Sequence, residues 1–172
     1  MRGKQAILAI LSMALVAAGF GIWFKCQMTD QVLELFGPAS AQCVTSASQV
    51  TYLELSGSNG VSLTNQDEIT VLSATLFNGT SWLDISDAVG LSHLRHALLQ
   101  DVSYDWHATP GSLPCWQHAL QFVGDRDRTT LLFDLDQRYV FILEQGQQGV
   151  LHAKITQGLR EYLTGLTQAK HL

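Results

Sequence analysis

Four consecutive residues, Tyr104, Asp105, Trp106 and His107, bring together side chains that recognition surfaces use often. They open a segment with two prolines, which predicts a loop over residues 104–114. Aromatic rings beside polar groups are typical of binding surfaces, and binding residues concentrate on loops. We therefore predict a recognition site at these four residues. The alternative is a loop that folds Trp106 back onto the core.

A hydrolytic site built from a histidine and an acid is the second possibility. His118 alternates with apolar residues on a strand that we predict over 115–123. Either His107 or His118 could act as a general base beside Asp105 or Asp134. A histidine on an apolar face is more often a buried, hydrogen-bonded residue than a catalytic base. The sequence therefore favours a binding module over an enzyme.

Two histidines, His93 and His96, lie three residues apart on a predicted helix, which is close enough to share a metal ion. Leu91, Leu94 and Leu98 form the apolar face of that helix, so both imidazoles are expected to face solvent. No third ligand is close in sequence. We predict no metal site and no cofactor.

An apolar strand, Leu131 to Asp136, ends in Asp-x-Asp. This pattern resembles the nucleophile motif of the haloacid-dehalogenase-like phosphatases, in which the first carboxylate attacks phosphorus. The resemblance implies a large parallel α/β domain that holds Mg²⁺. The sequence departs from that family, because Gln137-Arg138 replace its Gly-Thr and too little chain follows. We therefore interpret Asp134 and Asp136 as residues of a tight turn.

Three cysteines are present, Cys26, Cys43 and Cys115. In an oxidising compartment we predict a disulfide between Cys43 and Cys115, with a Cys26–Cys43 pair as the open alternative. The sequence has no Cys-x-x-Cys pair, which argues against thiol redox catalysis and against a cysteine zinc site.

An uncharged apolar run, Ala6 to Phe24, follows Arg2 and Lys4. A bilayer-spanning helix needs about 20 apolar residues, so we predict a signal-anchor helix with the N-terminus in the cytoplasm. The alternatives are a cleaved signal peptide, which leaves a secreted or periplasmic protein, and a lipoprotein acylated on Cys26. We divide the chain into an anchor at 1–28, a spacer at 29–48 and an extracytoplasmic domain at 49–172. Within the spacer, Thr29 to Phe36 could form a short amphipathic helix that ends at Gly37-Pro38.

The formal net charge is -5, and all 15 acidic residues lie at or after Asp30. An acidic domain argues against nucleic-acid binding, which needs clustered Lys and Arg. It also argues against docking on anionic lipid. The expected partners are the membrane, through residues 6–24, and a protein of the cell envelope.

The hydrophobic periodicity predicts an α+β domain in the order ββαβββα, an antiparallel sheet with helices packed on one face. The predicted strands are 50–55, 68–77, 115–123, 129–135 and 139–144, with a turn at 145–149 and a possible short strand at 150–154. The predicted helices are 84–100, which Asp84 or Ser86 can cap, and 156–167. The expected function is a membrane-anchored extracytoplasmic binding module. A small hydrolase and an accessory subunit of an envelope complex are the alternatives.

Overall fold

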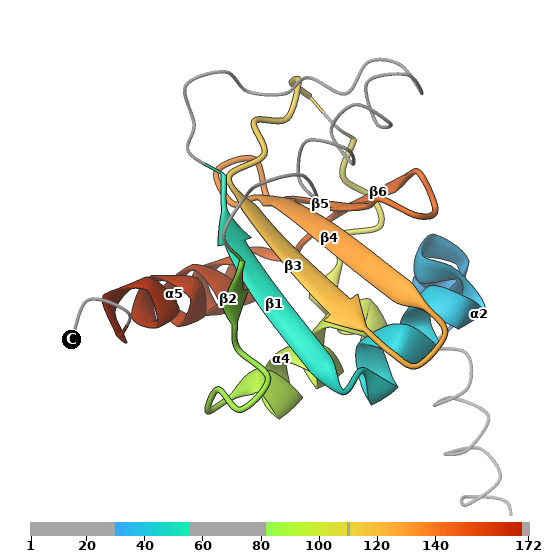
Figure 1. Ribbon diagram of the computed structural model, residues 1–172. Coiled ribbons are helices and arrows are strands. Elements are labelled where there is room, and N and C mark those ends of the chain that lie inside the picture. The colour runs from blue at the N-terminus through green and yellow to red at the C-terminus, as the bar shows by residue number, and fades with distance from the viewer. Residues whose placement is uncertain (1–29, 56–81, 110, 170–172) are drawn as a thin grey trace, which may run out of the picture.

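In the described part of the chain, six strands form one open antiparallel sheet, and three α-helices pack against it (Figure 1). The computed structural model describes residues 30–55, 82–109 and 111–169, and the predicted strand at 68–77 lies outside them. The elements, in chain order, are α2 (Asp30–Ser46), β1 (Gln49–Glu54), β2 (Leu83–Asp84), α4 (Leu91–Leu98), the 3-10 helix η1 (Asp101–Ser103), β3 (His118–Val123), β4 (Arg128–Asp134), β5 (Tyr139–Ile142), β6 (Gln147–Val150) and α5 (Ala153–Ala169). The predicted α+β class and antiparallel sheet are confirmed.

The strands are ordered β2-β1-β3-β4-β5-β6, and β3 to β6 form a meander joined by short turns. His118 on β3 stands opposite Phe133 on β4 and Glu54 on β1. Side chains alternate between the two faces of a strand, so Leu120 and Phe122 share the face of His118. This register determines which polar side chains lie on the same face of the sheet and can contact one another.

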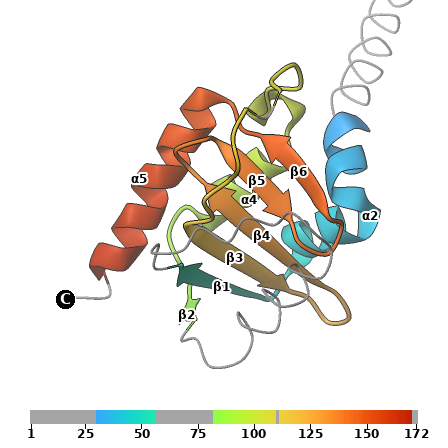
Figure 2. The ribbon, with the colours of Figure 1, turned by 90° about the horizontal axis from the view of Figure 1, so that it is seen from above.

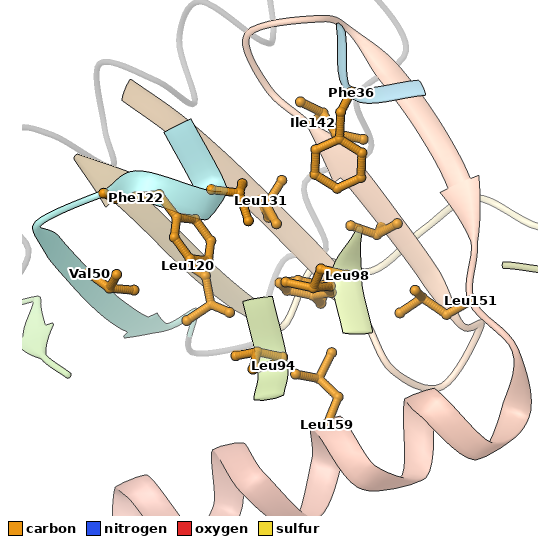
Figure 3. Close-up of a cluster of buried hydrophobic side chains, with 14 of the residues drawn as sticks. Phe36, Val50, Leu94, Leu98, Leu120, Phe122, Leu131, Ile142, Leu151 and Leu159 are labelled. Carbon is orange, nitrogen blue, oxygen red and sulfur yellow. The ribbon is translucent and has the colours of Figure 1, made fainter. Parts of the chain in front are cut away.

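The main core lies on the face of the sheet that the three helices cover (Figures 1 and 2). Figure 3 shows how the core joins the layers: Phe36 comes from α2, Leu98 from α4 and Leu159 from α5. Phe36 and Leu98 are fully buried, and burying a side chain of this kind stabilises the fold by about 1.5–3 kcal/mol. The expected placement of helices on one face is therefore seen.

Helix α2 occupies most of the expected spacer at 29–48, so that part of the prediction is corrected. Gly37 has φ 70° and ψ 154°, and the helix kinks there instead of ending. The kink lets both halves pack on the sheet, and Phe36 and Val44 are fully buried. The small, polar composition after Pro38 suggested a linker because it lacks a wide apolar stripe.

Polar side chains from distant elements hold both ends of α2. Near its start, the carboxylate of Asp101 accepts a hydrogen bond from Val32 N at 2.9 Å. Near its end, Arg95 of α4 donates to the carbonyl oxygens of Thr45 at 3.1 Å and Ala47 at 2.8 Å. Helix ends have unpaired backbone groups, so these contacts tie α2 into the folded domain.

Helix α4 confirms the predicted buried stripe of Leu91, Leu94 and Leu98. It is shorter than the predicted 84–100 and begins after Gly90, whose φ of 92° a glycine adopts without strain. The expected caps serve elsewhere, because Asp84 belongs to β2 and binds the hydroxyl and the N–H of Ser86.

The second face of the sheet has a smaller apolar cluster, centred on Ala119, Leu132 and Phe141. Trp116 packs there, with its ring centroid 5.7 Å from that of Phe141. Thr130 is fully buried, and its backbone N–H donates to the carboxylate of Glu144 at 2.7 Å.

Candidate functional site

The predicted aromatic loop begins with a structural residue, Tyr104. Its side chain is 5% exposed, and its hydroxyl donates to the carbonyl oxygen of Leu98 at 2.7 Å. Burial raises the pKa of this hydroxyl, and the nearby carboxylate of Asp101 raises it further. Tyr104 also forms a β-bridge with Leu151, which follows β6. It therefore fixes the loop against the sheet.

Trp106 is half-buried and lies on Tyr104, with the ring centroids 5.2 Å apart. Its indole N–H donates to the carbonyl oxygen of Asp101 at 3.0 Å. Asp105 donates its backbone N–H to Val150 on β6 at 2.8 Å, while His107 is exposed. The loop does fold Trp106 against the core, which was the alternative interpretation.

The remaining surface of Trp106 lines a depression of about 300 Å³ between α2 and β6. The other walls are Gln31, Glu34 and Leu35 on α2 and Gln147 on β6. A flat ring, two carboxamides and one carboxylate can stack against a ligand and hydrogen-bond to it. Of the four predicted residues, Trp106 is the one that lines this depression.

Among the described strands β6 is an edge of the sheet, so its outer backbone groups pair with none of the others. Val150 O accepts from the loop, and Leu151 N donates to Arg138 O on the β5 side. Backbone groups alternate in direction along a strand, so the N–H and C=O of Gln148 point outward, like those of Val150. Within the described residues they have no partner. The edge therefore offers one open donor and one open acceptor near Trp106.

His118 forms a polar pair with Tyr52 on the core face, where Nδ1 lies 2.9 Å from the Tyr52 hydroxyl. Burial lowers the pKa of His118, and the carboxylate of Glu54 opposes this shift only in part. Burial, then Glu54, raises the pKa of Tyr52 to about 12, so the phenol stays protonated. A protonated phenol donates to Nδ1 of a neutral imidazole, so the pair is a satisfied structural contact.

The proposed hydrolytic dyad of His118 and Asp134 is not assembled. His118 is opposite Phe133, so the next residue, Asp134, points to the other face of the sheet. Asp134 is 1% exposed, and its carboxylate accepts backbone N–H bonds from Cys115 at 2.7 Å and from Asp136 and Gln137 at 3.0 Å each. It holds the turn after β4.

The Asp-x-Asp pattern on β4 also has none of its phosphatase context. Both neighbours of β4 are antiparallel, whereas the phosphatase resemblance required a parallel sheet. Asp136 pairs with Arg160 of α5 at 2.9 Å and accepts from Gln117 at 2.8 Å. The turn interpretation of Asp134 and Asp136 agrees with these contacts.

His93 and His96 are exposed on α4, as the leucine stripe predicted. The ring of His96 lies 2.6 Å from the side-chain nitrogen of Gln100. Among the residues that the structure describes, no group of three His, Cys, Asp or Glu side chains is placed to hold a metal ion.

Cys43 and Cys115 are both free, so the predicted disulfide is absent from this structure. Cys43 is buried at the β3–β4 turn, where its thiol lies 3.4 Å from the carbonyl oxygens of Phe122 and Asp127. Cys115 is exposed before the opposite end of β3. At about 3.3 Å per residue, the length of the strand separates the two thiols. Cys26 lies outside the described residues.

A second hollow, of about 300 Å³, lies between α4 and α5. Leu94, Leu98 and Leu159 belong both to its lining and to the core (Figure 3). Tyr162 also lines it, and the buried Tyr162 hydroxyl has no hydrogen-bond partner within the part of the chain that the structure describes. A buried polar atom without a partner costs about 1–3 kcal/mol.

No protein-family model, curated protein or solved structure matches this chain. Across residues 30–55, 82–109 and 111–169, no helix has both the length and the apolar composition to cross a bilayer. The predicted anchor at 6–24 lies outside those residues.

Sequence reasoning missed the α2 side of the depression, Gln31 and Glu34, because both fell in the expected spacer. It missed Gln147 because a turn was predicted over 145–149. The single signal for this site was Trp106.

Proposed function

We propose that this chain is a membrane-anchored, extracytoplasmic binding module that takes an extended segment of an envelope protein at the edge of β6. The apolar run at 6–24 is the proposed anchor, with the domain on the far side of the membrane. The observation that carries the proposal is the open backbone pair of Gln148 beside the Trp106 depression.

Addition of a strand to a sheet edge is a common way to bind peptides. Backbone hydrogen bonds supply affinity, and pockets beside the edge select side chains. In this chain the segment at Tyr104 and Asp105 already pairs with the end of β6, and it turns away at Trp106. Among the residues that the structure describes, none continues this pairing next to Gln148, where a partner strand would fit.

The wall of the depression is rigid because α2 and β6 are in close contact. A Cβ atom at Gly149 would lie 2.9 Å from Cδ2 of Leu35 and 3.3 Å from Cδ1 of Tyr104. A preformed site loses less conformational entropy on binding than a mobile one. Glu34 is the charged residue in the lining, so a partner with a lysine or arginine near its anchor residue is the best match.

Site-specific photo-crosslinking in the native membrane tests this proposal. A photoreactive amino acid is placed at Gln147 in the depression and, as the matched control, at Gln157, an exposed glutamine of α5. We expect a discrete protein adduct from Gln147 that Trp106→Ala removes and His107→Ala retains. Identical adducts from both sites, or adducts that persist in Trp106→Ala, would contradict the proposal.

A further inference from the structure

We infer that the hollow between α4 and α5, here called the α4–α5 groove, binds a single-chain carboxylate amphiphile. The ligand would lay its tail on the apolar floor and its carboxylate at Lys154. This site lies on other elements than the β6 edge and does not depend on the proposed function.

The floor of the groove is apolar and its shape suits a chain. Leu94, Leu98 and Leu159 form part of the lining, and Gly158 stands in the same wall on α5. A Cβ atom at Gly158 would meet no atom within 4 Å, so the missing side chain leaves open space. A volume of about 300 Å³ holds roughly ten groups of the size of a water molecule, at about 30 Å³ each.

The charge at the groove is of one sign. Lys154 is the fixed cation of the lining, no acidic residue belongs to the lining, and within the described residues Lys154 forms no ion pair. In a chain of net charge -5 an unpaired lysine beside an apolar hollow favours an anion. His93, also in the lining and exposed, adds a hydrogen-bonding ring at the rim.

The position of the charge sets the orientation of the ligand. Lys154, Gly158 and Tyr162 follow one another at intervals of four residues, so they share one face of α5. Lys154 and Tyr162 are separated by about 12 Å at 1.5 Å per residue. The carboxylate therefore sits at the Lys154 end, and the tail passes Gly158 toward the ring of Tyr162.

Titration calorimetry of the full chain in phosphatidylcholine nanodiscs tests the inference, with empty nanodiscs as the blank. The probes are octanoate, which has an eight-carbon chain and a carboxylate, and 1-octanol, which has the same chain and no charge. We expect saturable binding of octanoate at one site and binding of 1-octanol that is about three- to fivefold weaker, typical of one exposed charge contact. Lys154→Gln should remove this preference.

Substitutions that fill the groove test the position of the ligand in the same calorimetry experiment. Gly158→Leu should weaken octanoate binding by at least about tenfold, because the leucine occupies the space of the tail. Gly165→Leu is the matched control, since Gly165 is also an exposed glycine of α5 with open space, outside the lining. It should change affinity by less than about twofold. Ala97→Leu fills the groove from α4 and serves if Gly158→Leu does not fold.

Three results would overturn the inference. One is octanoate binding in Gly158→Leu and Ala97→Leu that equals the binding in wild type. Another is equal affinity of the wild type for octanoate and 1-octanol. The third is absence of saturable octanoate binding; a bilayer lipid retained in native mass spectrometry would then make a lipid acyl chain the occupant.

Discussion

Thr129 on β4 offers a substitution that should increase stability by removing a polar group. The residue is fully buried, and its hydroxyl has no hydrogen-bond partner among the described residues. It stands opposite Phe122 and shares the helix-covered face with Leu131. A buried hydroxyl without a partner costs about 1–3 kcal/mol, and valine replaces it with a methyl group of similar size.

We therefore expect Thr129→Val to raise the free energy of unfolding by about 1–2 kcal/mol. For a domain of this size the melting temperature should rise by roughly 2–4 °C for each kcal/mol. Thermal unfolding of the full chain followed by circular dichroism measures the shift. Thr156→Val is the matched control, because the buried Thr156 hydroxyl donates to His152 O at 3.2 Å.

The control should lose about 0.5–1.5 kcal/mol, the net contribution of an ordinary hydrogen bond. A Thr129→Val protein that is destabilised as much as Thr156→Val would refute the reasoning. That result would mean that the Thr129 hydroxyl has a partner, such as a buried water molecule.

Two other predictions concern the His118 pair and the contact between α2 and β6. Burial lowers the pKa of folded His118 below its unfolded value of about 6.5, so the unfolded chain binds more protons as the pH falls through that range. Stability should therefore be complete above about pH 6.5 and decline below it, and denaturant titrations from pH 8 to pH 5 should show a smaller decline for His118→Gln. Gly149→Ala should lower the free energy of unfolding by about 1–3 kcal/mol through overpacking against Leu35. Gly165→Ala should raise it by about 0.5–1 kcal/mol, because alanine replaces an uncrowded helical glycine. An unchanged melting temperature for Gly149→Ala would contradict the tight contact.

The sequence predicts the parts of the fold in which local pattern and tertiary structure agree. The stripe of Leu91, Leu94 and Leu98 has helical spacing and faces the core, so α4 was identified with its buried side. The meander from β3 to β5 was also visible, because apolar strands alternate with short turns, whereas most of β6 fell in a predicted turn. In both cases neighbours in sequence are neighbours in space.

The parts that depend on distant contacts were not visible. Helix α2 extends past Gly37-Pro38 because its second half packs on the sheet and Arg95 binds its last carbonyl groups. The predicted Cys43–Cys115 bridge ignored the register that places the two thiols at opposite ends of β3. No local pattern contains this information.

The candidate site also has a part that was visible in the local sequence and a part that depends on distant contacts. Trp106 was visible as an aromatic residue in a loop, but its depression needs α2, and the hydrogen bonds of Tyr104 and Trp106 to Leu98 and Asp101 need the folded loop. The α4–α5 groove is defined by two helices that are distant in sequence.

Amide hydrogen exchange at Gln148 is the most direct measurement of the central claim. The full chain is compared with its complex with a synthetic copy of the peptide cross-linked from Gln147. If the partner adds a strand at the edge of β6, exchange of the Gln148 amide should slow by about tenfold or more, and Trp106→Ala should restore the rate of the free protein. An unchanged Gln148 amide in a saturated complex would contradict the account.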